Sequence, residues 1–373
     1  MEQPTNMSAT EEKESSVAPA TKKSAGGPKE SDNQKPKHKL TWMLVHSVLA
    51  AAIGSGFQHG YNAAVLNSPQ KLVMTWMNET LQASDAKLEI VWSMTVSIVC
   101  IGGIVGSALT SLLAGTLGRR MTLISNNGLA TLAGLMMGTA KYIDGYWLLI
   151  LGRFVSGLNA GLNAGVAPMY LSEISPMRLR GSIGAMYQLV ITISILIAQV
   201  LGHENVLGTE CCWPMLLYLI IIPAIYQVVA LFFSPDSPKY LLERGKDEKA
   251  IKASEQLCGK VEGEANIEAI RNEIAAAREL PKVTMHDMVK VKKYRKPLII
   301  MCLLMAAQQL SGINAVIYYS TDIFKAGGLS ESTAQLATVG VGIVNVLVTI
   351  AGVFLVETVG RKPLLAVGFV VCQ

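Results

Sequence analysis

The sequence of 373 residues is 51% hydrophobic and 16% charged, and its formal net charge is +5. Soluble domains carry about 25% charged residues, so this composition argues against a soluble protein. The small positive charge forms no basic stripe with interleaved aromatic side chains, which argues against nucleic-acid binding. Basic cytoplasmic loops of a membrane protein account for it better.

Residues 1–40 are polar, rich in Lys, Glu, Ser and Pro, and they lack the apolar segment of a signal peptide. They predict a disordered cytoplasmic tail. After them, apolar runs recur at about 20 residues, the length that crosses a bilayer as a helix. The predicted spans 1 to 6 are about 41–66, 90–114, 121–140, 147–171, 181–204 and 214–234, and spans 7 and 8 are about 297–321 and 335–356.

Two further segments complete this organisation. Residues 235–296 are polar but carry Ala, Glu, Lys and Ile at helical spacing, which predicts a cytoplasmic helical linker domain. A ninth span would begin near Pro363, and the roughly 11 residues after Lys362 are too few to cross a bilayer. We therefore expect an all-α polytopic membrane protein with a complete six-span N-terminal bundle (41–234) and a partial C-terminal bundle (297–373).

The short loops predict the orientation of the spans. Arg119 and Arg120 follow span 2, Arg180 follows span 4, and Arg361 follows span 8. Because basic loops stay on the cytoplasmic side, these ends and the N-terminus are predicted to be cytoplasmic. Asn78, in the acceptor pattern Asn-Glu-Thr, then lies in the first external loop and is a predicted glycosylation site.

Uncharged polar residues inside the predicted spans are the main indication of a ligand path. They are Gln58, His59 and Asn62 in span 1, Gln188 and Gln199 in span 5, Gln308, Gln309, Ser311 and Asn314 in span 7, and Asn345 in span 8. Amides are costly in hydrocarbon unless they are paired or face water. They either join helices by hydrogen bonds or line a polar path, and in the second case they suit a neutral polyhydroxy ligand, because amides both donate and accept.

Glycines mark two other features. Gly157, Gly161 and Gly165 in span 4 are spaced four apart, which predicts close packing of helix backbones and not a ligand site. Ser311-Gly312 interrupts span 7, where the helix could bend or open around a substrate. No phosphate-binding loop, nucleophile elbow or metal-ligand cluster occurs, so the sequence predicts neither an enzyme nor a cofactor.

Several segments together resemble the sugar porter family of the major facilitator superfamily, and within it the animal facilitative glucose transporters. They are QHGYNAAVLNSPQ (58–70), GRF (152–154), PMYLSEISPMRLRG (168–181), QLVITISILIAQV (188–200), PDSP (235–238) and QQLSGINAVIYYST (308–321). The resemblance covers residues 41 to 373. It implies a major facilitator fold of two six-span halves, with the second half incomplete in this sequence.

The resemblance also implies site residues. The implied sugar contacts are Gln188, Gln308, Gln309, Asn314 and Asn345. The implied cytoplasmic gate of ion pairs contains Arg119, Arg120, Arg153, Glu173, Arg180, Glu357 and Arg361. A static anchor of positive charges is the alternative to a gate, but acidic residues such as Glu173 and Glu357 add nothing to membrane insertion.

Some positions depart from the family pattern. Gly115, Thr116 and Thr358 stand where the family carries polar or charged gate residues, which predicts a thinner network and a weaker cytoplasmic closure. Met305-Ala306-Ala307 replaces the Gln-Leu-Ser of glucose-selective members, which leaves hexose selectivity open. Asn62 stands where proton-coupled members carry Asp, and an amide cannot load and release a proton, which favours uncoupled transport.

The resemblance therefore implies facilitative transport of a hexose, first of all glucose, by alternating access in the plasma membrane, with the sugar and the lipid bilayer as partners. Two alternatives stay open: a transporter-like sugar sensor, and an inactive truncated isoform or fragment. The oligomeric state is open as well.

Overall fold

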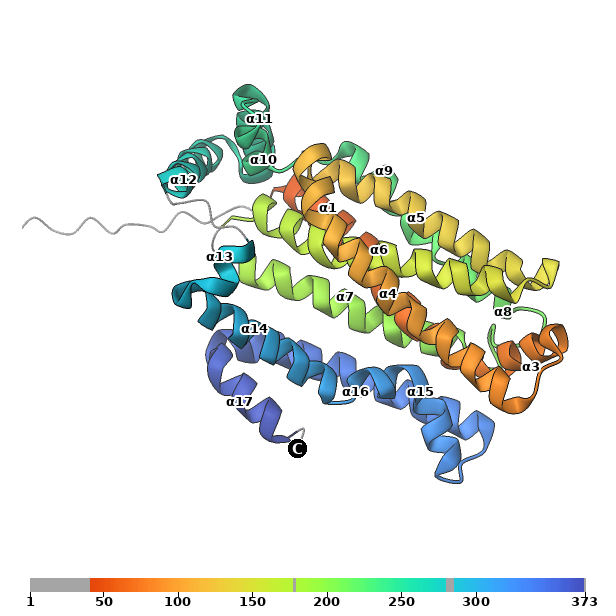
Figure 1. The fold of residues 1–373 in the computed structure, drawn as a ribbon. Helices are drawn as coiled ribbons and strands as arrows, with labels where there is room; N and C mark the ends of the chain where they lie inside the picture. The colour runs from red at the N-terminus through yellow and green to blue at the C-terminus, as the bar shows by residue number, and fades with distance from the viewer. Residues whose placement is uncertain (1–40, 177–178, 280–284, 372–373) are drawn as a thin grey trace, which may run out of the picture. The chain divides into compact units, whose positions relative to one another are not determined.

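The computed structural model describes residues 41–176, 179–279 and 285–371, and these segments consist of helices joined by turns, with no strand among them (Figure 1). The tail predicted for residues 1–40 lies outside the described residues. The all-α prediction is confirmed, and the helices fall where the spans were predicted.

The first span is not one regular helix. It consists of α1 (Trp42–Ala51), a wide π-type turn (Ala52–Gly56) and α2 (Phe57–Ala64). A π turn carries one extra residue per hydrogen-bonded ring and often occurs at functional sites. Gly54 lies in this turn, and any Cβ there would collide with the side chain of Gln227. The wide turn therefore lets Gln227 approach the middle of span 1.

A helix that the sequence analysis did not predict follows span 1. This helix, α3 (Gln70–Leu81), occupies the predicted first external loop. It ends at Gln82, which adopts a left-handed backbone (φ 45°) and whose backbone N–H donates to the carbonyl of Asn78. Its buried residues Val73, Trp76 and Met77 belong to the same apolar core as the spans, so α3 is packed onto the bundle.

The next spans are α4 (Asp85–Leu117), α5 (Arg119–Thr139), α6 (Tyr146–Ile174) and α7 (Arg180–Leu201), and span 6 is split into α8 (Trp213–Tyr218) and α9 (Ile221–Phe233). The glycine prediction for span 4 is confirmed: a Cβ at Gly157 or Gly161 would collide with the backbone of α4. Gly102 of α4 reciprocates against α6. Small residues on both helices thus let the two backbones touch.

The segment after span 6 folds into short helices, α10 (Pro238–Glu243), α11 (Asp247–Cys258), α12 (Lys260–Glu279) and α13 (Met285–Lys290). An apolar cluster of its own, including Tyr240, Leu242 and Ile267, joins α10, α11 and α12. The hydroxyl of Thr41, just before α1, donates to the carbonyl of Leu257. The linker helices therefore contact the start of span 1.

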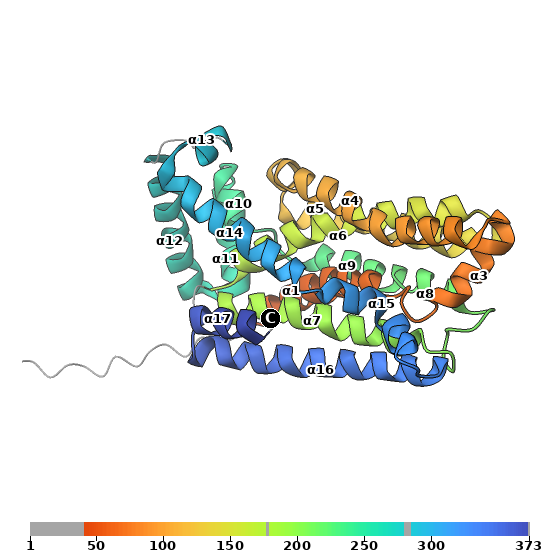
Figure 2. The ribbon, with the colours of Figure 1, turned by 60° about the horizontal axis from the view of Figure 1, so that its bottom comes forward.

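The last helices are α14 (Lys292–Leu310), α15 (Ile313–Ala326), α16 (Glu331–Thr358) and α17 (Arg361–Val371). Figures 1 and 2 show α16 running beside α7. At their contact, a Cβ at Gly342 would collide with Oε1 of Gln199, whose side chain is 2% exposed. Spans 5 and 8 thus pack tightly at this glycine. In contrast, no residue of α14 is buried.

Five helical segments of the described residues are long and apolar enough to cross a membrane, namely α4, α7, α8–α9, α14–α15 and α16. The helices of spans 3 and 4 are less apolar. Helix α5 carries Asn126 and Asn127, and α6 carries Asn159 and Asn163. These asparagines are buried within the bundle. Outward-facing apolar side chains of α4, including Ile90, Ile101 and Ile104, are exposed, as expected of a surface that faces lipid.

Candidate functional site

The predicted sugar-contacting amides lie on α7, α14, α15 and α16. The side chains of Gln188, Gln308, Gln309 and Asn314 are exposed, and that of Asn345 is half-buried. One pair is joined directly: Nδ2 of Asn314 donates to Oε1 of Gln309 at 2.6 Å. Among the described residues, the side chains of Gln188, Gln308 and Asn345 have no recorded hydrogen-bond partner.

The break in span 7 explains how that pair meets. Gly312 has φ +80°, a left-handed conformation that glycine adopts without a Cβ penalty. The hydroxyl of Ser311 donates to the carbonyl of Gln308 at 2.6 Å and closes the end of α14. Because α15 restarts at Ile313, the two amides on either side of the break face each other and both remain exposed. The predicted interruption of span 7 is therefore confirmed.

Two of the predicted gate residues, Arg119 and Glu173, meet at the end of the bundle where α4 meets α5 and α6 ends; we call it the inner end. Arg119 and Glu173 form a two-pronged ion pair, with Nε–Oε2 and Nη2–Oε1 distances of 2.8 Å each. Both side chains are about nine-tenths shielded, at 10% and 11% exposure. Oε2 of Glu243 lies 3.8 Å from Nη2 of Arg119, and the guanidinium lies over the ring of Tyr240.

Arg120 holds the same corner by different contacts. Its backbone N–H donates to Oδ1 of Asp236 at 3.2 Å, and its Nη2 donates to the carbonyl of Phe232 at 2.8 Å. Burial raises the pKa of Asp236, while hydrogen bonds from the backbone N–H groups of Ser237 and Arg120 oppose that rise. The PDSP segment thus locks the end of span 6 to the start of span 3.

The linker contributes contacts where the family pattern is missing. The guanidinium of Arg244 donates to the carbonyls of Gly115 and Thr116, and the hydroxyl of Tyr240 donates to the latter at 3.1 Å. These carbonyls end α4 and have no partner within the helix. The sequence analysis predicted only a thinner network of gate residues at Gly115 and Thr116. In the structure, Tyr240 of α10 and Arg244, which follows it, supply hydrogen bonds to this segment.

Arg180 lies close to the Arg119–Glu173 pair. Its Nε donates to the carbonyl of Ser175 at 3.3 Å. With Glu173, Lys239 and Glu273 it lines a polar cavity of about 220 Å³. The hydrogen bond from Lys239, whose Nζ lies 2.6 Å from Oε1 of Glu273, lowers the pKa of that carboxyl. The side chains of Glu357 and Arg361, two further predicted gate residues, lie outside the described part of the structure.

Arg153 does not join the gate, and this corrects the sequence prediction. It precedes Glu173 by twenty residues on the same helix, which places it about 30 Å away at about 1.5 Å per residue. Its side chain is 1% exposed, and Nη1 donates to the main-chain oxygen of Asn62 at 2.7 Å. A sequence motif assigned Arg153 to the cytoplasmic gate. Its position along α6 places it far from the end of that helix where Glu173 lies.

A buried amide network inside the N-terminal bundle is the main feature that the sequence analysis missed. Oε1 of Gln58 accepts from Asn159 at 3.1 Å and from Asn163 at 3.3 Å, and its Nε2 donates to Asn127 at 2.6 Å. Gln227 lies 3.4 Å from the same Nε2. Gln58 was predicted either to line a path or to join helices, and the structure shows the second.

The opposite end of the bundle, which we call the outer end, joins the N-terminal spans to α15 and α16. Nδ2 of Asn67 donates to the carbonyl of Ile317 at 2.8 Å and to Oγ of Ser320 at 2.7 Å. Nε2 of Gln335 donates to the carbonyl of Ser68 at 3.3 Å. Polar residues at span ends were the available signal, but their partners are 250 to 267 positions away in sequence.

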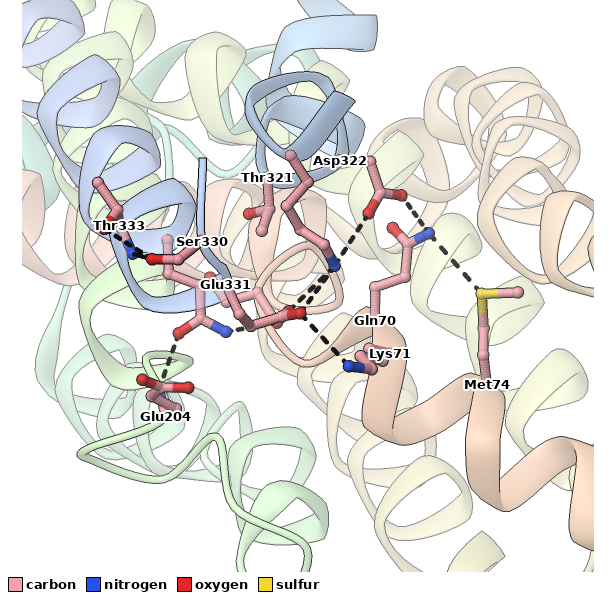
Figure 3. A network of polar contacts seen from close by, with 12 residues as sticks. Gln70, Lys71, Met74, Glu204, Thr321, Asp322, Ser330, Glu331 and Thr333 are labelled. Atoms are coloured by element: carbon pink, nitrogen blue, oxygen red, sulfur yellow. Dashed lines mark hydrogen bonds and ion pairs between the residues drawn. The ribbon is translucent and has the colours of Figure 1, made fainter. Parts of the chain in front are cut away.

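Ion pairs extend this contact, as Figure 3 shows. Nε2 of Gln70 donates to Oδ2 of Asp322 at 2.5 Å. Glu331 lies between two lysines, at 3.0 Å from Lys325 and 3.7 Å from Lys71. Helix α3 is therefore tied to both α15 and α16. Among the described residues, no group of three or more His, Cys, Asp or Glu side chains could hold a metal ion.

The predicted glycosylation acceptor lies at this end, on α3. Asn78 is half-buried, and its Oδ1 is shielded from water without a hydrogen-bond partner. Thr80, the third residue of the acceptor pattern, donates from Oγ1 to the carbonyl of Trp76 at 3.1 Å. The acceptor thus stands on a helix that packs against the bundle.

Comparison with known protein families places the fold in context. The model of the family described as "Sugar (and other) transporter" matches residues 47–373. The chain is 42% identical over 348 residues to the solute carrier family 2 facilitated glucose transporter member 5 of Equus caballus, covering 91% of this chain and 70% of that protein. It is 42% identical over 337 residues to member 3 of the same family from Homo sapiens, covering 88% and 67%.

Two solved structures are similar as well. One is the xylose transporter XylE from E. coli in a partially occluded inward-open conformation, with a TM-score of 0.73 and 25% identity over 86% of this chain and 75% of that chain. The other is the XylE proton:xylose symporter bound to 6-bromo-6-deoxy-D-glucose, with a TM-score of 0.75 and 26% identity over 86% and 71%. The helices described above therefore have the arrangement of a major facilitator protein.

Proposed function

Because this chain belongs to the sugar (and other) transporter family, we propose that it carries a neutral hexose, glucose before others, across the plasma membrane without coupling to an ion gradient. The chain is an integral membrane protein with the major facilitator fold. The relatives named as facilitated glucose transporters support the substrate class. Within the chain, the exposed amide pair at the break in span 7 supports it most directly.

The chemistry of the proposed contacts fits a neutral polyol. Gln188, Gln308, Gln309, Asn314 and Asn345 offer donors and acceptors without a formal charge. A hydroxyl group can replace the Gln309–Asn314 hydrogen bond, because it both donates to and accepts from an amide. Binding then exchanges one set of hydrogen bonds for another without leaving a buried charge.

The contacts at the two ends support alternating access. At the outer end, Asn67 and Gln335 tie the N-terminal spans to α15 and α16. At the inner end, the Arg119–Glu173 pair joins α5 to α6 within the N-terminal half. This arrangement is the one expected of a carrier closed at the outer end, which we assign to the external side of the membrane. The halves would exchange these contacts as they rock about the substrate.

The surroundings of Arg153 support uncoupled transport. Its guanidinium is fully buried, and the structure records a contact with the backbone of Asn62 and none with a carboxylate among the described residues. A proton-coupled carrier relays its proton through titratable side chains within the spans. An amide at Asn62 cannot do so, which leaves the concentration gradient of the sugar as the driving force.

Transport by the chain in liposomes tests this proposal. We expect uptake of labelled glucose down its gradient, unchanged by a protonophore, and reduced in Gln309→Ala. The matched control is Gln256→Ala, since Gln256 is an exposed glutamine on α11, away from the spans. Sugar binding without uptake would favour a sensor, and uptake that the protonophore abolishes would contradict the uncoupled mechanism.

A further inference from the structure

A cavity at the outer end lies between α3, α4 and α15. It measures about 550 Å³ and is lined by, among others, Gln70, Met74, Asn78, Leu88, Trp92 and Lys325. A cavity of this size holds small molecules in other proteins. It is distinct from the amides of the proposed transport site, none of which belongs to its wall.

The wall of this cavity carries polar atoms without partners. Oε1 of Gln70, Oδ1 of Asn78 and Nε1 of Trp92 are shielded from water and have no hydrogen-bond partner among the described residues. Trp92 is 4% exposed. A buried polar atom without a partner destabilises the fold, so a ligand that bonds to these three atoms is favoured. Two acceptors and one indole donor, beside the apolar Met74 and Leu88, suit a ring with hydroxyl groups and an apolar face.

Asn78 connects this cavity to covalent chemistry. It is the acceptor of the pattern Asn78-Glu79-Thr80 and is itself part of the wall. In glycosylation, Nδ2 of the asparagine displaces the pyrophosphate of a lipid-linked oligosaccharide. The new bond joins Nδ2 to the anomeric carbon, the bond from that carbon to the phosphate oxygen breaks, and one amide proton leaves. The first sugar rings therefore start at the edge of the cavity.

We propose that the first sugar rings of a glycan on Asn78 occupy this cavity and bridge α3 and α4 to α15. Oε1 of Gln70 accepts from a sugar hydroxyl group while Nε2 keeps its bond to Asp322, and Nε1 of Trp92 donates to another hydroxyl group once these shielded atoms open to the cavity. The apolar faces of the rings cover Met74 and Leu88. The same helices already meet through Gln70 and Asp322 at 2.5 Å. A glycan in this position adds contacts between the N-terminal spans and α15, and so favours the closed outer end.

Cysteine labelling in cells tests where the glycan lies. Ser93 is an exposed residue of the cavity wall on α4, whereas Asn205 is exposed and lies outside it. Each is replaced by cysteine in a Cys211→Ser, Cys212→Ser background and labelled with a membrane-impermeant maleimide. We expect enzymatic removal of the glycan to raise the labelling rate of Ser93→Cys several-fold and to leave Asn205→Cys unchanged.

Variants of the acceptor pattern separate the glycan from the fold. Thr80→Ser keeps the pattern and should keep Ser93→Cys protected, whereas Thr80→Ala removes the glycan and should expose it. Equal labelling before and after deglycosylation would overturn the proposal, as would a chain whose electrophoretic mobility shows no glycan. Protection of the Thr80→Ala variant by free glucose would assign the cavity to a diffusible sugar instead, which also overturns it. None of these outcomes depends on transport.

Discussion

The guanidinium of Arg153 donates from Nη1 to the main-chain oxygen of Asn62 at 2.7 Å, and both side chains are buried, at 1% and 3% exposure. This contact joins α6 to span 1 inside the N-terminal bundle. Nδ2 of Asn62 makes no hydrogen bond, although it is shielded from water. A fixed positive charge therefore stands beside an asparagine whose amide nitrogen lacks a partner among the described residues.

A carboxylate in place of that amide should introduce coupling. In Asn62→Asp, the new carboxylate stands near the Arg153 guanidinium, which favours its ionised form, so it takes up a proton only when the transport cycle separates the two groups. We expect glucose uptake by this variant to depend on external pH and to fall when a protonophore is added. The control is Asn62→Ser, which is polar but does not titrate in this range. If uptake by Asn62→Asp changes neither with pH nor with the protonophore, a role of residue 62 in proton coupling is contradicted.

The Arg119–Glu173 pair should carry measurable stability. Glu173→Gln removes the nearer anion of a shielded guanidinium and leaves only Glu243 at 3.8 Å, and breaking such a pair costs about 3 kcal/mol. We expect a lower melting temperature of the purified chain in detergent. The comparison is Lys71→Gln, which breaks an ion pair whose lysine side chain is 72% exposed, worth less than about 1 kcal/mol. Equal effects of the two variants would argue that the inner pair is solvated.

The close approach of α7 and α16 at Gly342 predicts a steric effect. Gly342→Val would drive a side chain into Gln199, and overpacking of this kind costs about 1–3 kcal/mol. The matched control is Gly340→Ala on the same helix, where a Cβ meets nothing within 4 Å. Thermal denaturation should show a loss for the first and little change for the second. Adding Gln199→Ala should recover part of the loss, and a failure to recover any would place the clash elsewhere.

Cys258 should react slowly and in a strongly pH-dependent way. Burial, helped by the charge of Glu262, raises the pKa of its thiol to about 11. Because only the thiolate attacks a maleimide, about one thiol in a thousand is reactive at pH 8. The labelling rate in the folded chain should then rise about tenfold per pH unit up to about pH 11. A rate at pH 8 as high as that of the exposed Cys211 would show that α11 is not packed as described.

The periodic features of the chain could be predicted from the sequence. Apolar runs gave the spans, and the spacing of Gly157 and Gly161 gave the close packing of α6 against α4. Ser311-Gly312 gave the break in span 7, since glycine allows the left-handed turn found at Gly312. These predictions succeed because each depends on the local sequence and on the chemistry of a helix in lipid.

The partners of individual polar side chains could not be predicted in this way. Gln58 and Gln309 are both amides in predicted spans, yet the first is bonded to Asn127, Asn159 and Asn163 in the bundle core and the second is exposed. Likewise, a motif put Arg153 at the gate, where only the register of α6 could show that it faces span 1 instead. Which amide pairs and which stays free depends on the rotation of each helix against its neighbours.

The sequence alone therefore determined the kind of molecule: an all-α membrane protein of the sugar transporter family, with an uncharged residue at Asn62. The tertiary structure decided which polar groups meet, namely Arg119 with Glu173 at the inner end and Asn67 with Ser320 at the outer end. The physical reason is the distance along the sequence over which each feature is encoded. Hydrophobic periodicity depends on neighbouring residues. A hydrogen bond needs two atoms within about 3 Å, and only folding of the chain brings residues 253 positions apart to that distance.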